Sequence, residues 1–123
     1  MDKQKILIAD DEPRIRLLVS RMLGEEYIVL EAADGEEALD IAERQQPALI
    51  LMDLMMPKID GYTACLGIKT DQITKEIPVV MLTAIGHELN KSFAEEMGAA
   101  GYITKPFTRE ALLEQIRRLL PPA

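Results

Sequence analysis

The sequence predicts an α/β domain in which a five-stranded parallel sheet is covered by helices on both faces. Five short apolar runs alternate along the chain with helix-like segments. Several of the runs are continuous in Ile, Leu, Val and Met, which is typical of strands buried on both faces of a parallel sheet. Alternating strands and helices favour parallel pairing with right-handed crossover connections.

The predicted strands are short and evenly spaced. They cover residues 5–9, 27–31, 48–52, 77–82 and 100–103. A common order for five such strands is 2-1-3-4-5, the doubly wound, flavodoxin-like (βα)5 arrangement, in which the strand order reverses between the first and third strands. Ligands bind to such sheets at that reversal, beyond the C-terminal ends of the strands.

A helix is predicted after each strand. In the first helix, Ile15, Leu18, Val19 and Met22 follow the i, i+3, i+4, i+7 spacing of a buried face, and we expect Gly24 to end it in a left-handed conformation. The same kinds of signal predict a second helix from Asp34-Gly35 to before Pro47 and a third over 61–68, which Gly67 weakens. A fourth predicted helix carries Leu89, Phe93, Ala94 and Met97 and ends at Gly98. The fifth carries Leu112, Ile116, Leu119 and Leu120.

Composition and charge narrow the classes of protein. At 123 residues the chain fits a single domain, residues 1–123, that is large enough to bury a core. Its formal charge of −7 argues against direct binding of nucleic acid, which depends on clustered Lys and Arg. No apolar run approaches the roughly 18 residues of a membrane span, so we expect no membrane partner. Cys65 is the only cysteine, which excludes an internal disulfide and suits a cytoplasmic location.

Acidic residues and one lysine lie at the ends of predicted strands. Asp10 and Asp11 follow the first strand, Asp53 the third, and Lys105 the fifth. Each has an ordinary explanation, since an Asp before Pro13 could cap a helix and Asp53 could begin a turn. Together they would converge on one crevice, where the repulsion of three carboxylates requires a cation or a lysine. Oxygen ligands of this kind suit Mg²⁺. With Mg²⁺ and Lys105 neutralising a phosphoryl group, Asp53 is a candidate nucleophile that forms an aspartyl phosphate.

Two further residues fit a phosphoryl site. Thr83 ends the fourth apolar run, and its hydroxyl could donate to a phosphoryl oxygen, although a β-branched residue at a strand end is an equally good explanation. Lys105 precedes Pro106, and a cis bond before proline can aim the preceding side chain.

Four segments with these residues match the motifs of a known family. They are Ile6–Glu12, Leu51–Pro57 together with Asp60 and Gly61, Pro78–Ala84, and Gly101–Phe107. In order and spacing they resemble the receiver domain of two-component response regulators, of the chemotaxis-regulator kind. The resemblance covers essentially the whole chain.

The resemblance implies that the chain is a phosphorelay switch and not a turnover enzyme. Asp53 would accept a phosphoryl group from a sensor histidine kinase or a phosphotransfer protein, and the domain would catalyse only this reaction and a slow autodephosphorylation. The implied roles of the other residues are as follows: Asp11, Asp53 and the backbone carbonyl of Met55 bind Mg²⁺, or Mn²⁺ in its place; Asp10 assists through water; Thr83 and Lys105 hold the phosphoryl oxygens; Thr83 and Tyr102 form the switch; and Pro57, Gly61 and Pro106 are structural.

The resemblance also implies an output. Phosphorylation would change the surface of the fourth helix, fifth strand and fifth helix, and so control a downstream protein or a fused output domain. Many receivers fused to winged-helix DNA-binding domains carry two acidic residues before the fifth-strand aromatic. This chain has Gly, Ala, Ala and Gly at residues 98–101, before Tyr102. That difference favours a stand-alone receiver or another kind of output.

Two other classes share parts of the pattern. A flavodoxin-like cofactor-binding protein has the same sheet order, but it needs a phosphate-binding loop rich in Gly, Ser or Thr, where this chain has Asp-Asp-Glu-Pro at residues 10–13. A phosphatase of the haloacid-dehalogenase type also forms an aspartyl phosphate. It carries a second Asp with one residue between, where this chain has Met55, and 123 residues leave no room for its cap domain.

Overall fold

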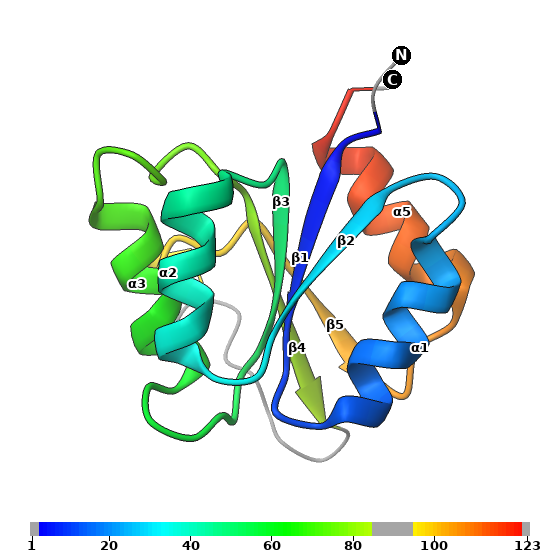
Figure 1. Ribbon diagram of the computed structural model, residues 1–123, viewed down its shortest axis with the longest axis horizontal. Coiled ribbons are helices and arrows are strands. Elements are labelled where there is room, and N and C mark those ends of the chain that lie inside the picture. Colours follow the sequence, from blue (N-terminus) through cyan, green and yellow to red (C-terminus); the bar gives the residue numbers. More distant parts are fainter. Residues whose placement is uncertain (1–2, 85–94, 122–123) are drawn as a thin grey trace.

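The computed structural model describes residues 3–84 and 95–121. Five strands form one parallel sheet in the predicted order, β2-β1-β3-β4-β5 (Figure 1). The strands are β1 (Lys5–Ala9), β2 (Ile28–Ala32), β3 (Leu49–Asp53), β4 (Val79–Ala84) and β5 (Gly101–Lys105), and the helices are α1 (Pro13–Leu23), α2 (Gly35–Gln45), α3 (Gly61–Thr70) and α5 (Arg109–Leu119). Leu89, Phe93 and Ala94 of the predicted fourth helix lie outside the described residues.

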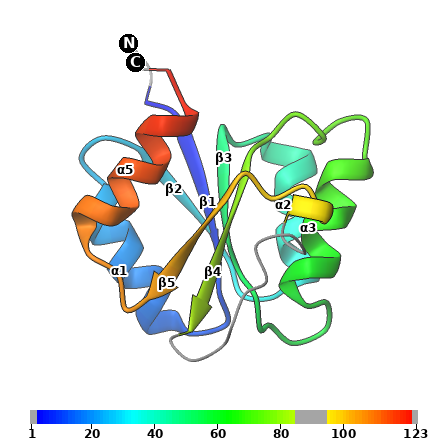
Figure 2. The same ribbon diagram turned by 180° about the vertical axis from the view of Figure 1, so that it is seen from behind.

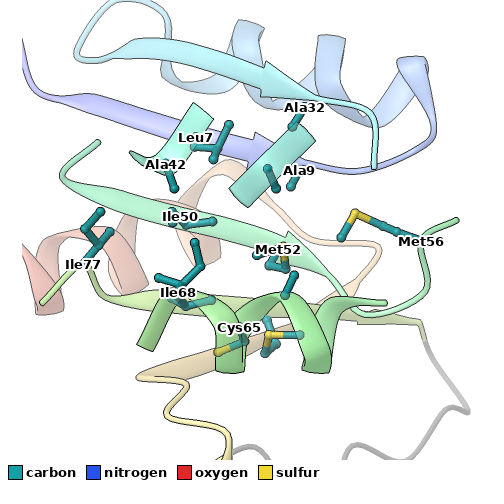
Figure 3. Close-up of a cluster of buried hydrophobic side chains, with 14 of the residues drawn as sticks. Leu7, Ala9, Ala32, Ala42, Ile50, Met52, Met56, Cys65, Ile68 and Ile77 are labelled. Carbon is teal, nitrogen blue, oxygen red and sulfur yellow. The ribbon is translucent and has the colours of Figure 1, made fainter. Parts of the chain in front are cut away.

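Helices cover both faces of the sheet, as predicted. α2 and α3 lie on one face, and α1 and α5 lie on the other (Figures 1 and 2). Alternate residues of a strand enter opposite layers: Leu7 packs in the core on the α2–α3 side, and Ile8 packs on the α1–α5 side. Figure 3 shows the first of these cores, to which Ile50 and Met52 of β3 contribute. All five residues of β3 are buried, which explains its continuous apolar sequence.

Side-chain caps fix the start of three helices. Asp34 accepts a hydrogen bond from Glu37 N (2.8 Å), Asp60 from Thr63 N (2.8 Å), and Thr108 from Ala111 N (3.0 Å). These contacts satisfy backbone donors that have no partner inside the helix. Among the described residues, no helix is both long and apolar enough to cross a bilayer.

The prediction for Gly24 was wrong. Gly24 has right-handed dihedral angles (φ −60°, ψ −20°), and its N–H donates to Ser20 O. A Cβ at this position would lie 2.7 Å from Ser20 O, so the glycine allows a close backbone approach. The left-handed cap occurs instead at Gln46 after α2, with φ 45°.

Four strands also lie further along the chain than predicted. β2, β3, β4 and β5 begin and end one or two residues later than the apolar runs that predicted them. Asp53, Thr83 and Lys105 are therefore strand residues, paired with Leu82, Thr104 and Ala84. The runs were misleading because strand pairing uses main-chain groups and continues through polar residues. The shift places these three side chains on a rigid sheet.

Candidate functional site

Three aspartates meet at the C-terminal edge of the sheet, two just after β1 and one at the end of β3. One carboxylate oxygen each from Asp10, Asp11 and Asp53 lies within 4.8 Å of the other two. Ala9 pairs with Met52 across β1 and β3, so the next residues along, Asp10 and Asp53, emerge side by side. The strand reversal thus brings together the acids that the sequence placed at separate strand ends.

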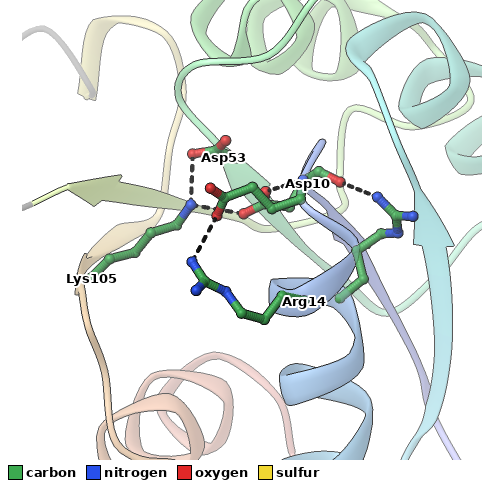
Figure 4. A network of polar contacts seen from close by, with 6 residues as sticks. Asp10, Arg14, Asp53 and Lys105 are labelled. Carbon is green, nitrogen blue, oxygen red and sulfur yellow. Dashed lines mark hydrogen bonds and ion pairs between the residues drawn. The ribbon is translucent and has the colours of Figure 1, made fainter.

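Lys105 reaches this cluster from β5 (Figure 4). Its ammonium group donates to Asp10 Oδ2 at 2.8 Å and to Asp53 Oδ1 at 3.2 Å. The side chain of Asp10 is fully buried, while that of Lys105 is 19% exposed. The Lys105–Pro106 peptide bond is cis. The sequence had suggested a lesser part for Asp10, but this residue makes the shorter contact with the lysine.

Asp10 does not cap the first helix, which was the ordinary explanation for its presence. The residue before α1 is Glu12, which makes no side-chain cap, and Pro13 occupies the first turn. Asp10 Oδ1 accepts instead from Glu12 N at 2.9 Å, and its carbonyl oxygen accepts from Arg16 at 2.7 Å. Both carboxylate oxygens of Asp10 are therefore engaged within the protein.

Burial and like charges shape the electrostatics of Asp53. Burial raises the pKa of its carboxyl group to about 6, the negative charges of Asp10 and Asp11 add to the rise, and Lys105 opposes it. For Lys105, burial lowers the pKa, but the hydrogen bond to Asp10 and the two nearby carboxylates outweigh this, so the net pKa is raised. The lysine is thus held as a cation against an acidic cluster with excess negative charge.

A pocket of about 380 Å³ adjoins the cluster. Asp11, Asp53, Met55 and Lys105 are among the residues that line it. Asp11 is exposed and Asp53 is 7% exposed, so carboxylate oxygens face this space from two strands. An all-oxygen donor set of this kind fits Mg²⁺, which binds through one or two carboxylates together with waters.

Thr83 and Tyr102 lie on neighbouring strands, β4 and β5. Thr83 on β4 is 4% exposed. Tyr102 on β5 pairs with Met81, two residues before Thr83, so both side chains project from the same face of the sheet. Tyr102 is 42% exposed, which means that its ring lies largely outside the core in this structure.

The loop from β3 to α3 is packed closely against its surroundings. A Cβ on Gly61 would lie 2.3 Å from Asp53 O, and one on Gly35 would lie 2.1 Å from Ile59 O. Ile59 N donates to Pro57 O at 2.8 Å. These contacts account for glycine at position 61 and hold the loop against Asp53.

Arg16, which was not among the predicted site residues, contacts the backbone of Asp10 from α1. Its other hydrogen bond joins Glu31 of β2 at 3.1 Å. The available signal was position, since Arg16 lies three residues before the buried Val19 and therefore near the inner face of the helix.

The fold and the crevice together define the class of protein: a doubly wound α/β domain with an acidic cluster at the C-terminal ends of β1 and β3, where the strand order reverses. Residues 6–117 match the model of the response regulator receiver domain, and the chain belongs to that family, which acts in two-component phosphorelay signalling. This is the first of the three classes that the sequence left open.

Similar proteins come from several organisms. The chain is 44% identical over 121 residues to the probable transcriptional regulator ycf27 of Porphyridium aerugineum, covering 98% of this chain and 49% of that protein. It is 45% identical over 119 residues to the DNA-binding dual master transcriptional regulator RpaA of Synechocystis sp., covering 94% of this chain and 48% of that protein. The chain thus spans about half the length of these relatives.

Two solved structures share the fold. The chemotaxis response regulator CheY4 of Vibrio cholerae is 34% identical with a TM-score of 0.89, covering 97% of this chain and 100% of that chain. The receiver domain of the sensor histidine kinase PA1611 of Pseudomonas aeruginosa PAO1 is 33% identical with a TM-score of 0.87, covering 96% and 98%, and holds a magnesium ion in its active-site cleft.

Proposed function

We propose that this domain, residues 1–123, receives a phosphoryl group on Asp53 from a phosphohistidine of a sensor histidine kinase or a phosphotransfer protein. The observation that carries the proposal is the convergence of three aspartates and Lys105 on one pocket in a receiver-domain fold. A carboxylate oxygen of Asp53 attacks phosphorus, the P–N bond breaks, and the imidazole leaves with the bonding electrons. The product is an aspartyl phosphate.

A divalent metal bound beside Asp53 would reduce the repulsion between the two reacting anions. Mg²⁺ would be held by Asp11, Asp53 and the backbone carbonyl of Met55, all of which belong to residues lining the pocket. Asp10 would act through water, which agrees with the engagement of both its oxygens by Lys105 and Glu12 N. Mn²⁺, which also prefers oxygen ligands, would substitute. When bound, the metal would supply positive charge beside Asp53, which favours ionisation of a carboxyl group whose pKa is otherwise about 6.

Lys105 and Thr83 complete the phosphoryl site in this proposal. On phosphorylation, Lys105 would exchange its contact with Asp53 for a phosphoryl oxygen while keeping Asp10 as an anchor. The Thr83 hydroxyl would donate to a second oxygen, and Tyr102, which projects from the same face, would follow it inward. The domain catalyses its own phosphorylation and a slow loss of the group by hydrolysis.

The altered surface would include β5 and α5 and would control a downstream protein or an output domain joined to the receiver. The charge of −7 supports an output without direct nucleic-acid contact by this domain. A cytoplasmic site of action fits the buried, unpaired Cys65.

Intact mass spectrometry tests the assignment of the acceptor. After incubation with Mg²⁺ and acetyl phosphate, the wild type is expected to gain one phosphoryl group and Asp53→Asn to gain none. Asp40→Asn, which removes an exposed carboxylate outside the pocket, is the matched control and should be labelled like the wild type. Equal labelling of the Asp53 variant and the wild type would refute the proposal.

A further inference from the structure

Arg16 connects the acidic site to the edge strand of the sheet. Its Nη1 donates to the main-chain oxygen of Asp10 at 2.7 Å, and its Nε donates to Glu31 Oε1 on β2 at 3.1 Å. The side chain is only 17% exposed. An arginine held at both ends in this way, below the surface, is fixed in orientation by its planar guanidinium group.

The contact of Arg16 is with the peptide group that joins the first two acids. Asp10 N donates to Ala32 O at 3.0 Å, so the chain leaves β1 with Asp10 already tied to β2. The carbonyl of Asp10 belongs to the peptide plane that leads into Asp11. Fixing that carbonyl therefore fixes the backbone direction from which the exposed carboxylate of Asp11 projects.

We infer that Arg16 is a positioning residue for the metal site: by holding the Asp10 carbonyl, it sets the placement of Asp11 relative to Asp53. This inference rests on the proposed binding of a divalent cation by these acids. Mg²⁺ demands near-octahedral geometry, so its binding weakens when one ligand, here the Asp11 carboxylate, is held less firmly in place. Groups that orient metal ligands from outside commonly change affinity by roughly 10- to 100-fold when removed.

Positioning and simple charge predict opposite results when Arg16 is removed. The guanidinium is a positive charge close to the acidic cluster, and on charge alone its loss would make the site more negative and bind Mg²⁺ more tightly. If Arg16 instead positions the Asp10–Asp11 peptide, its loss must bind Mg²⁺ more weakly. The sign of the change separates the two effects.

The test is calorimetric titration of the full chain with Mg²⁺, at a temperature where each variant is folded. Arg16→Ala should raise the Mg²⁺ Kd by about tenfold or more. Arg21→Ala removes the same charge from an exposed position in the last turn of the same helix and should leave the Kd close to that of the wild type. An unchanged or lower Kd for Arg16→Ala would overturn the inference.

A second, more conservative variant keeps the test informative if Arg16→Ala does not fold. Arg16→Lys keeps the charge, but its single ammonium group lacks the fork that contacts Asp10 and Glu31 together. Its Kd should lie above that of the wild type and below that of Arg16→Ala, and a wild-type Kd would count against positioning. A merely structural role would lower the denaturation midpoint of these variants without changing the Kd of the folded protein.

Phosphorylation by acetyl phosphate gives an independent readout. Arg16→Ala should need more Mg²⁺ for half-maximal labelling yet reach the wild-type rate at saturating Mg²⁺, and a reduced rate at saturation would contradict a role through the metal. Failure of the proposed function looks different, because the wild type would then bind Mg²⁺ without labelling of Asp53. In that case the Kd comparison still decides the role of Arg16.

Discussion

The ammonium nitrogen of Lys105 lies 2.8 Å from Oδ2 of Asp10, a carboxylate with no exposed surface. The two residues are 95 positions apart in the chain. Because Asp10 cannot be solvated, its charge depends on this lysine and on the backbone donor of Glu12. The pair therefore stabilises the site before any ligand binds.

Removal of the lysine should destabilise the metal-free protein and increase its response to metal. Lys105→Met leaves the buried carboxylate of Asp10 with no cation in contact with it, and we expect a loss of about 3 kcal/mol in the free energy of unfolding. Mg²⁺ should then restore more stability to the variant than it adds to the wild type, since a cation returns to the cluster. Urea denaturation in EDTA and in Mg²⁺ measures both effects.

Lys58→Met is the control for that comparison. Lys58 also pairs with an aspartate, Asp34 at 3.6 Å, but its side chain is 61% exposed. Such surface pairs contribute roughly 0 to 1 kcal/mol, so the change should be small with or without metal. Equal losses in the two variants would show that Asp10 is not dependent on Lys105.

The raised pKa of Asp53 predicts a pH dependence of stability. Its folded pKa of about 6 lies above the ordinary value of 3.8, so the folded state holds its proton more tightly than the unfolded state. The ionised carboxylate therefore costs stability, and the cost grows as pH rises from about 4 to about 6 and then stays constant. In EDTA, Asp53→Asn should become more stable than the wild type across this range, by about 1 to 2 kcal/mol after allowance for solvent screening.

Asp40 should have the opposite effect on the pH dependence of stability. The hydrogen bond from Arg44 lowers the pKa of Asp40, so its carboxylate adds stability above the ordinary pKa and loses it as pH falls. Thermal melts of the wild type, Asp53→Asn and Asp40→Asn at several pH values test both directions. A pH-independent difference between Asp53→Asn and the wild type would contradict the shift.

Glycine 61 should be needed for the site as well as for the loop. In Gly61→Ala the new Cβ would meet Asp53 O at 2.3 Å and Leu54 Cα at 2.8 Å, so the backbone beside Asp53 must move. We expect a loss of about 2 to 3 kcal/mol and weaker Mg²⁺ binding. Denaturation and calorimetry measure the two quantities.

Gly67→Ala is the matched substitution within the same helix. Its nearest contact would be Leu39 Cδ2 at 3.0 Å, the end of a flexible side chain. The gain in helix propensity, about 1 kcal/mol, offsets this crowding, so stability should change little and Mg²⁺ affinity should not change. A similar loss of affinity in both variants would mean that the effect of Gly61→Ala does not arise at Asp53.

Tyr102 should become less exposed when Asp53 is phosphorylated. It is 42% exposed here, and burial of an aromatic ring is favourable when space opens beside it. Hydroxyl-radical footprinting should show protection of Tyr102 in the phosphorylated wild type but not in phosphorylated Thr83→Ala. Tyr27, which packs against the core on the α1–α5 side, serves as the internal reference. Unchanged labelling of Tyr102 would remove it from the switch.

The order of the strands and the convergence of the three aspartates could be predicted from the sequence. The predictions that were wrong have a common physical cause. Hydrophobic periodicity reports burial, so it located β1 at its observed residues but ended β3 before Asp53 and β5 before Lys105. Periodicity also could not indicate that the Lys105 ammonium group lies closer to the Asp10 carboxylate than to the Asp53 carboxylate, because these distances depend on how far the lysine side chain reaches across the sheet. Arg16 was missed for a related reason: its partner is a main-chain carbonyl, which every residue has, and no motif marks it.

The separation of Lys105 from the acids also affects how the chain becomes folded during synthesis. Asp10, Asp11 and Asp53 leave the ribosome well before Lys105, so the cluster of negative charge is present in the nascent chain before its internal counter-ion exists. β1 and β3 can pair at that stage only without the lysine that contacts the carboxylates of Asp10 and Asp53. Docking of β5, the last strand, adds both the final edge of the sheet and the missing positive charge. Docking of β5 and neutralisation of the site by Lys105 are therefore the same event in the assembly of this domain.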